Sequence, residues 1–152
     1  MPATESDFAT LTVLLGREPR SAFEVVVRGA AGEPIVIRNA PFLDDGTPMP
    51  TRFYLVDPVL VTRVSRIEST GGVRAAEAAV DGDALLRAHT DYAAERDAAI
   101  PADHDGPRPH GGVAGTQRGV KCLHAHYAFH LAGGDDPVGQ WVADRLAEED
   151  AS

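Results

Sequence analysis

The sequence contains only one cysteine, Cys122, among its 152 residues. An internal disulfide is therefore excluded, which is consistent with the reducing cytoplasm, the location that we expect. No apolar run approaches the roughly 18 residues that cross a bilayer. The first ten residues, MPATESDFAT, have neither the basic segment nor the apolar stretch of a secretion signal. We expect a protein without a membrane partner.

Positive charge is also scarce. The chain has 14 Lys and Arg against 23 Asp and Glu, for a net charge of −9. An acidic chain repels a polyanion at long range, so we expect no nucleic-acid partner. The charge is uneven, however, because the segment from Arg108 to Lys121 carries three cations and no acid. This segment could attract a small anion.

The chain shows no repeats and no linker that would divide it, so residues 1–152 are expected to form one domain with frayed ends. Two β-branched runs, Phe23–Arg28 and Pro34–Arg38, flank a glycine-containing turn and predict a hairpin. Arg52–Val56 could add a third strand. Residues 101–115 read as a long loop rich in glycine and proline.

Helical periodicity and capping residues predict four or five helices. The first expected helix is short and capped by Ser6 or Asp7, and the second is capped by Asp57, starts at Pro58 and stops at Gly71. A third is capped by Asp83 and ends before Pro101. A fourth carries the cysteine and three histidines, and a fifth starts at Pro137. The segment 73–80 is ambiguous. The fold class is therefore predicted to be α+β, with a small, mostly antiparallel sheet packed against helices.

The segment 111–134, GGVAGTQRGVKCLHAHYAFHLAGG, combines the only cysteine with three of the six histidines. On a helix His124 and His126 lie about 200° apart, and about 12 Å of rise separates Cys122 from His130. Only the pairs Cys122–His126 and His126–His130 could then present two ligands to one metal ion. A zinc site would need further ligands from elsewhere, such as His89, His104, His110 or a carboxylate.

Two other interpretations of this segment stay open. If it were a strand, Cys122, His124 and His126 would share one face and could all bind one ion. Alternatively, the histidines serve only in packing or on the surface. His89, Tyr92 and Arg96 form a similar row on the preceding helix. That row could bind an anion, but it is more typical of a helix face at the edge of a core.

The glycine-rich segment GGVAGTQRGVK, which precedes the expected helix, offers free backbone N–H groups beside Thr116, Arg118 and Lys121. If the helix begins near Arg118, its N-terminus would be a suitable anion site. The spacing does not match a P-loop. The same glycines could also form a plain connector.

The blocks LGREPR, DGTPMPTRFYLVDP, RGVKCLHAHYA and GGDDPVG resemble the bacterial family called domain of unknown function 501, which is common in actinobacteria. The resemblance runs from Asp7 to Leu146. It implies no particular activity. Many members of the family carry further cysteines at the positions of Gly29 and Asp57, so a shared cysteine cluster with Cys122 is not available in this chain.

Three functions remain open. In the preferred one, Thr116, Arg118 and Lys121 bind a small anionic, phosphate-like ligand. The catalytic candidates beside that ligand are Cys122, His124 and His126. One histidine would then act as acid or base, because its pKa lies near neutrality.

The second function is that of a noncatalytic interaction or regulatory protein, which contacts a partner chain through Pro101–Gly115. The third is that of a metal-binding domain, with His126 and His130 as the ligand pair. The residues do not decide whether the protein is an enzyme, and they indicate no particular cofactor.

Overall fold

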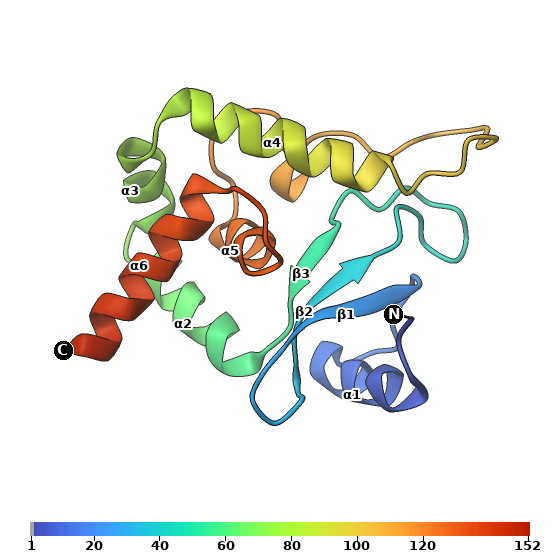
Figure 1. The fold of residues 1–152 in the computed structure, drawn as a ribbon, viewed down its shortest axis with the longest axis horizontal. Coiled ribbons are helices and arrows are strands. Elements are labelled where there is room, and N and C mark those ends of the chain that lie inside the picture. The colour runs from blue at the N-terminus through green and yellow to red at the C-terminus, as the bar shows by residue number, and fades with distance from the viewer. Residues whose placement is uncertain (1) are drawn as a thin grey trace.

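The computed structural model describes residues 2–152 (Figure 1). Its sheet has the order β1-β2-β3, with β1 at Phe23–Arg28, β2 at Pro34–Asn39 and β3 at Phe53–Leu55. The helices are α1 (Glu5–Leu15), α2 (Pro58–Ser69), α3 (Gly72–Ala79), α4 (Gly82–Asp97), the 3₁₀ turn η1 (Val113–Gly115), α5 (Leu123–Leu131) and α6 (Pro137–Ala151). The α+β prediction is confirmed. The six α-helices exceed the four or five expected, because the ambiguous segment 73–80 is helical.

The three strands are antiparallel, and the sheet separates two apolar clusters. The predicted hairpin is confirmed: Phe23 pairs with Asn39 at one end and Arg28 with Pro34 at the other. Side chains alternate between the two faces. Ile37 packs beneath α1, whereas Val36 faces the larger cluster under α5 and α6. Figure 1 shows α1 on one side of the sheet and the other helices on the opposite side.

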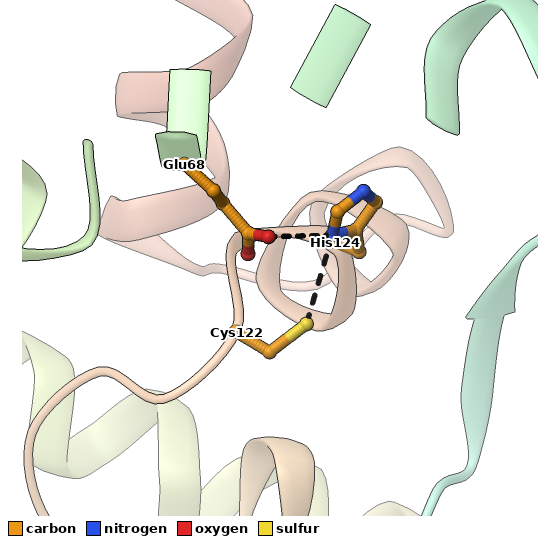
Figure 2. Close-up of side chains that lie close together, drawn as sticks. All are labelled: Glu68, Cys122 and His124. Atoms are coloured by element: carbon orange, nitrogen blue, oxygen red, sulfur yellow. Dashed lines mark hydrogen bonds and ion pairs between the residues drawn. The ribbon is translucent and has the colours of Figure 1, made fainter. Parts of the chain in front are cut away.

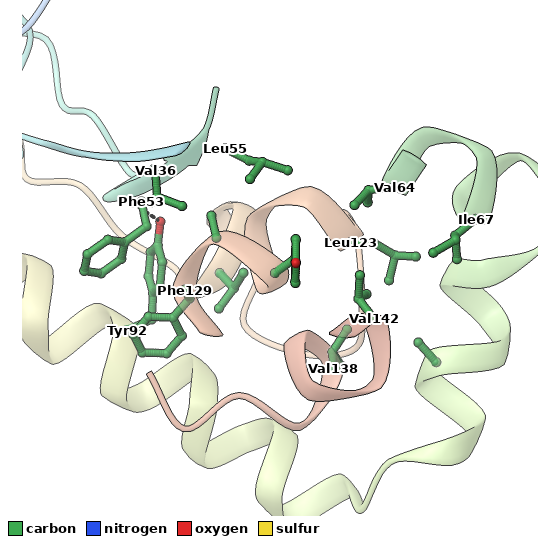
Figure 3. Packing of buried hydrophobic residues seen from close by; sticks show 14 of the residues in the cluster. Val36, Phe53, Leu55, Val64, Ile67, Tyr92, Leu123, Phe129, Val138 and Val142 are labelled. Atoms are coloured by element: carbon green, nitrogen blue, oxygen red, sulfur yellow. Dashed lines mark hydrogen bonds between the residues drawn. The ribbon is translucent and has the colours of Figure 1, made fainter. Parts of the chain in front are cut away.

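Helix α5 lies at the centre of the larger cluster, between the sheet and the remaining helices (Figure 3). Leu123 and Phe129 of α5 are buried, and Phe129 stacks on Phe53 of β3 at 5.5 Å between ring centroids. From α6, Val138 and Val142 pack against the same helix. Each such side chain contributes roughly 1.5–3 kcal/mol through burial. The position of α5 is thus fixed on all sides.

Two helix starts differ from the predicted ones. Helix α1 is capped by Thr4, not by Ser6 or Asp7; the Asp7 carboxylate instead accepts the Thr4 N–H and completes a capping box. Helix α4 is capped by Asp81 rather than Asp83. At both sites several capping residues follow one another, and propensity alone does not choose among them. The Asp57 cap of α2 and the start of α6 at Pro137 are confirmed.

None of the helices in residues 2–152 combines the length and the apolar content that crossing a lipid bilayer requires.

The row His89, Tyr92 and Arg96 on α4 is almost fully buried, as the core-edge interpretation predicted. The Tyr92 hydroxyl accepts the N–H groups of both Arg52 and Phe53, at 2.6 and 3.1 Å. Burial raises the pKa of Tyr92 to about 12, so the hydroxyl stays neutral at physiological pH. Tyr92 therefore fixes the backbone at the start of β3.

Arg96 fixes two irregular segments at once. Its Nη1 donates to the carbonyl oxygens of Pro50 and Gly111, at 3.1 and 3.0 Å. The guanidinium is also paired with the half-exposed carboxylate of Asp97. The loop before β3 and the loop before η1 are consequently held against the same side chain.

Removal of the Tyr92 hydroxyl tests this arrangement. Tyr92→Phe leaves two buried N–H groups without an acceptor, so the free energy of unfolding in urea should fall by about 1–3 kcal/mol. The control is Tyr54→Phe, because Tyr54 is 46% exposed; it should change the stability by less than about 0.5 kcal/mol. Equal losses in the two variants would contradict the assignment.

Candidate functional site

Helix α5 begins at Leu123, so the condition on which the anion site depended, a helix that begins near Arg118, is not met. Gly119 has a left-handed backbone with φ of 65°, and Cys122 is an extended N-cap residue with φ of −143° and ψ of 118°. The chain therefore changes direction between Cys122 and His124. This turn brings the Cys122 Sγ within 3.8 Å of the His124 Nδ1.

Glu68, in the last turn of α2, completes a cluster with these two residues (Figure 2). Its Oε1 lies 3.3 Å from the His124 Nδ1, and its Oε2 accepts the Leu123 N–H at 2.7 Å. One ligand atom from each of Glu68, Cys122 and His124 lies within 4.8 Å of the other two. All three residues are half-buried. We refer to them as the Glu68–Cys122–His124 cluster.

Hydrogen bonds on the far side of the imidazole fix the orientation of His124. Its Nε2 lies 3.0 Å from the Val61 carbonyl oxygen and 3.0 Å from the Ser65 hydroxyl. A carbonyl oxygen can only accept, so Nε2 carries a proton. The Nδ1 atom then faces the Glu68 carboxylate and the Cys122 sulfur.

The charge state of His124 follows from these neighbours. Contact with Cys122 raises the pKa of His124 to about 9; partial burial opposes the shift, and the Val61 carbonyl and the Glu68 carboxylate add to it. At neutral pH the imidazole of His124 is therefore protonated.

A pocket of about 400 Å³ opens beside the cluster. It runs along the edge strand β3 and is bounded by Val61 and Ser65 of α2 and by Ala114 of η1. Lys121, Cys122, His124 and Ala125 close the remaining side. Cys122 and His124 line the pocket, and Glu68 does not. The carboxylate therefore lies behind the other two side chains as seen from the pocket.

Residues 25–144 match the family model described as Protein of unknown function (DUF501). The chain belongs to the DUF501 family. The matched range contains the whole Glu68–Cys122–His124 cluster, and the resemblance noted in the sequence is confirmed. Neither the search of curated proteins nor the search of solved structures gave a match.

In this DUF501 chain two backbone amides near the start of α5 already have partners. Glu68 accepts the Leu123 N–H, and the Oε1 of Glu77 on α3 accepts the Val120 N–H at 2.7 Å. Two carboxylates of the chain itself thus occupy the positions that an external anion would take.

Of the three predicted ligand-binding residues, Thr116, Arg118 and Lys121, only Lys121 lines the pocket. The Thr116 hydroxyl donates to the Arg118 carbonyl within the loop. The Arg118 side chain is exposed and does not line the pocket. Lys121 is exposed as well, but it lines the pocket beside Cys122.

His126 points to other neighbours than Cys122 and His124 do. It is fully buried, and its Nδ1 lies 2.7 Å from the carboxylate of Asp136, the cap of α6. The His126 Nε2 has no hydrogen-bond partner among residues 2–152. His130 is half-buried and stacks on Tyr127. The clusters of metal-ligating side chains found in the described residues include neither His126 nor His130.

His89 holds the loop that leads to the cluster. Its Nδ1 accepts the Val113 N–H at 3.0 Å, and its Nε2 donates to the Gly119 carbonyl at 2.9 Å. This pattern requires a neutral imidazole, because a protonated Nδ1 cannot accept. Burial lowers the pKa of His89, in agreement with the neutral form.

Sequence reasoning missed Glu68. Its partner Leu123 lies 55 residues further along the chain. The local pattern at the end of α2 is that of an ordinary solvated glutamate. The position of Cys122 outside the helix was missed as well, because no residue nearby is a strong N-cap.

Acidification tests the role of His89. Since its pKa is lowered in the folded state, its stabilising contribution is complete above about pH 6.5 and is lost as the pH falls toward the folded-state pKa. We expect the free energy of unfolding to decrease between about pH 6.5 and pH 5. The decrease should be smaller in His89→Gln. His110→Gln, which alters an exposed imidazole, serves as the control and should behave as the unaltered protein. If the free energy of unfolding of His89→Gln depended on pH as it does in the unaltered protein, this role would be refuted.

Proposed function

We propose that the protein binds a divalent, borderline-soft metal ion such as Zn²⁺ through Glu68, Cys122 and His124. The observation that carries the proposal is the convergence of a carboxylate oxygen, a thiol sulfur and an imidazole nitrogen within 4.8 Å. These three donor types are the ones that zinc takes in proteins. The ligand set differs from the pair His126 and His130 that the sequence suggested.

The distances within the cluster suit one ion. A tetrahedral zinc ion separates its sulfur, nitrogen and oxygen ligands by about 3.4–3.6 Å. The Nδ1 of His124 lies 3.3 Å from the Glu68 oxygen and 3.8 Å from the Cys122 sulfur. For these two pairs the distances differ from the tetrahedral values by only a few tenths of an ångström, and the Glu68 oxygen and the Cys122 sulfur lie within 4.8 Å of each other.

The surroundings of the ligands also support metal binding. A metal-ligating histidine usually donates its other ring N–H to a carbonyl or carboxylate, as the His124 Nε2 does to Val61. A ligating carboxylate is in turn hydrogen-bonded, as Glu68 is to the Leu123 N–H. Both ligands are thus oriented before an ion arrives.

Three protein ligands beside a pocket are typical of a catalytic rather than a structural zinc site, in which the fourth position is left to water or substrate. Cys122 and His124 line the pocket and Glu68 lies behind them. The fourth position would therefore face the pocket. There an ion could polarise a ligand or lower the pKa of a bound water.

A second function has one observation in its favour. The 3.8 Å contact between the Cys122 Sγ and the His124 Nδ1 also suits a metal-free thiol–imidazole pair, with Cys122 as nucleophile and the protonated His124 beside it. Alkylation by iodoacetamide separates the two. A bound ion protects Cys122 until a chelator removes it, whereas a free pair reacts at once with or without chelator.

Metal content tests the main proposal. The full chain, purified without a nickel column, should contain about one equivalent of zinc by elemental analysis. After replacement by Co²⁺ it should show a thiolate-to-cobalt charge-transfer band in the near ultraviolet. Cys122→Ser should abolish that band, and Glu68→Gln should weaken metal affinity about tenfold or more.

Glu77→Gln is the matched control for Glu68→Gln. Both carboxylates accept one backbone N–H at 2.7 Å near the start of α5, but Glu77 is outside the cluster. Its variant should keep full metal affinity. If neither zinc nor cobalt binds to the unaltered protein, or if the two glutamine variants lose affinity equally, the proposal is wrong.

A further inference from the structure

We infer that the pocket beside the Glu68–Cys122–His124 cluster binds a small monoanion with an apolar body, such as a monocarboxylate. Its anionic group would take the open position on the metal ion and lie near the ammonium group of Lys121. The inference rests on the metal site proposed above, and adds to it the chemical class of the ligand.

The charges around the pocket favour a monoanion. The two positive charges of the ion are balanced by the Cys122 thiolate and the Glu68 carboxylate, while His124 is a neutral ligand. Lys121 then contributes one uncompensated positive charge at the pocket wall. Among the described residues that line the pocket none is acidic, although the chain as a whole carries a net charge of −9. A single negative charge in the ligand makes the site neutral, whereas a dianion such as phosphate leaves the site with an excess of one negative charge.

The side chains that line the pocket favour an apolar body for the ligand. Phe53 and Leu55 of β3, Val61 of α2 and Ala125 of α5 present apolar surface to the pocket. A volume of about 400 Å³ lies at the lower end of the range for small-molecule sites. A pocket with largely apolar walls and a single cationic residue suits a ligand with an apolar body and one charged group.

The anion site inferred here differs from the one expected from the sequence. Two backbone amides near the start of α5, those of Leu123 and Val120, are taken by Glu68 and Glu77. Of the predicted cations, Lys121 lines the pocket and Arg118 does not. The anion would thus be held by the ion and by Lys121, and not by a helix N-terminus.

The test titrates the Co²⁺-loaded full chain with octanoate, octanamide and inorganic phosphate, and follows the visible cobalt spectrum. Octanoate should perturb the spectrum at the lowest concentration. The neutral amide lacks the charge, and phosphate lacks the apolar body and carries excess charge. Both should bind at least about tenfold more weakly.

Variants identify the groups responsible. Lys121→Gln should weaken octanoate binding about tenfold, and Arg118→Gln, which removes an exposed cation outside the pocket, should not change it. Ala125→Leu narrows the pocket at a residue that is no ligand of the ion. It should abolish octanoate binding while the cobalt stoichiometry stays at one.

The two proposals fail in different ways. A chain that binds no cobalt refutes the metal site. A chain that binds cobalt but prefers phosphate, or binds octanoate equally well in the Lys121→Gln and Ala125→Leu variants, keeps the metal site and overturns the ligand class.

Discussion

The buried polar row on α4 is the constraint on which the rest of the structure depends. His89, Tyr92 and Arg96 leave the helix at successive turns and bond to backbone groups of segments that have little regular structure of their own. A buried backbone amide or carbonyl without a partner costs about 1–3 kcal/mol. This one helix face supplies partners for six backbone groups, of which the N–H groups of Arg52, Phe53 and Val113 form buried hydrogen bonds. The strand β3 on one side of the pocket and the loop with η1 on the other are both held in this way. The row on α4 thus anchors two of the segments that line the pocket.

Helix α2 connects the core with the candidate site. Val64 and Ile67 pack into the large apolar cluster, so the helix cannot slide along its axis. On the other side of the helix, the Val61 carbonyl and the Ser65 hydroxyl lie at hydrogen-bond distance from His124. Glu68 on the same side accepts the Leu123 N–H. The packing of the apolar face of α2 therefore fixes the position of its polar face. Any substitution that shifts α2, even far from the cluster, changes the distances among the three ligand atoms.

Most of the fold could be predicted from the sequence because its signals are local. The hairpin, the Asp57 cap and the start of α6 each depend on a few adjacent residues. The candidate site could be predicted only in part. Helical counting correctly separated His124 from His126, since two residues along a helix point to nearly opposite sides. It could not show that Cys122 precedes the helix, nor that Glu68 meets it from another helix, because both depend on tertiary contacts.

The N-cap of α5 has a consequence for the order of assembly. Cys122 makes no side-chain capping bond, so the first amide of the helix relies on Glu68, a residue that is synthesised earlier and belongs to another element. The first turn of α5 is therefore stabilised only once α2 has docked. The start of α5 and the meeting of the three donor atoms are thus coupled through one carboxylate.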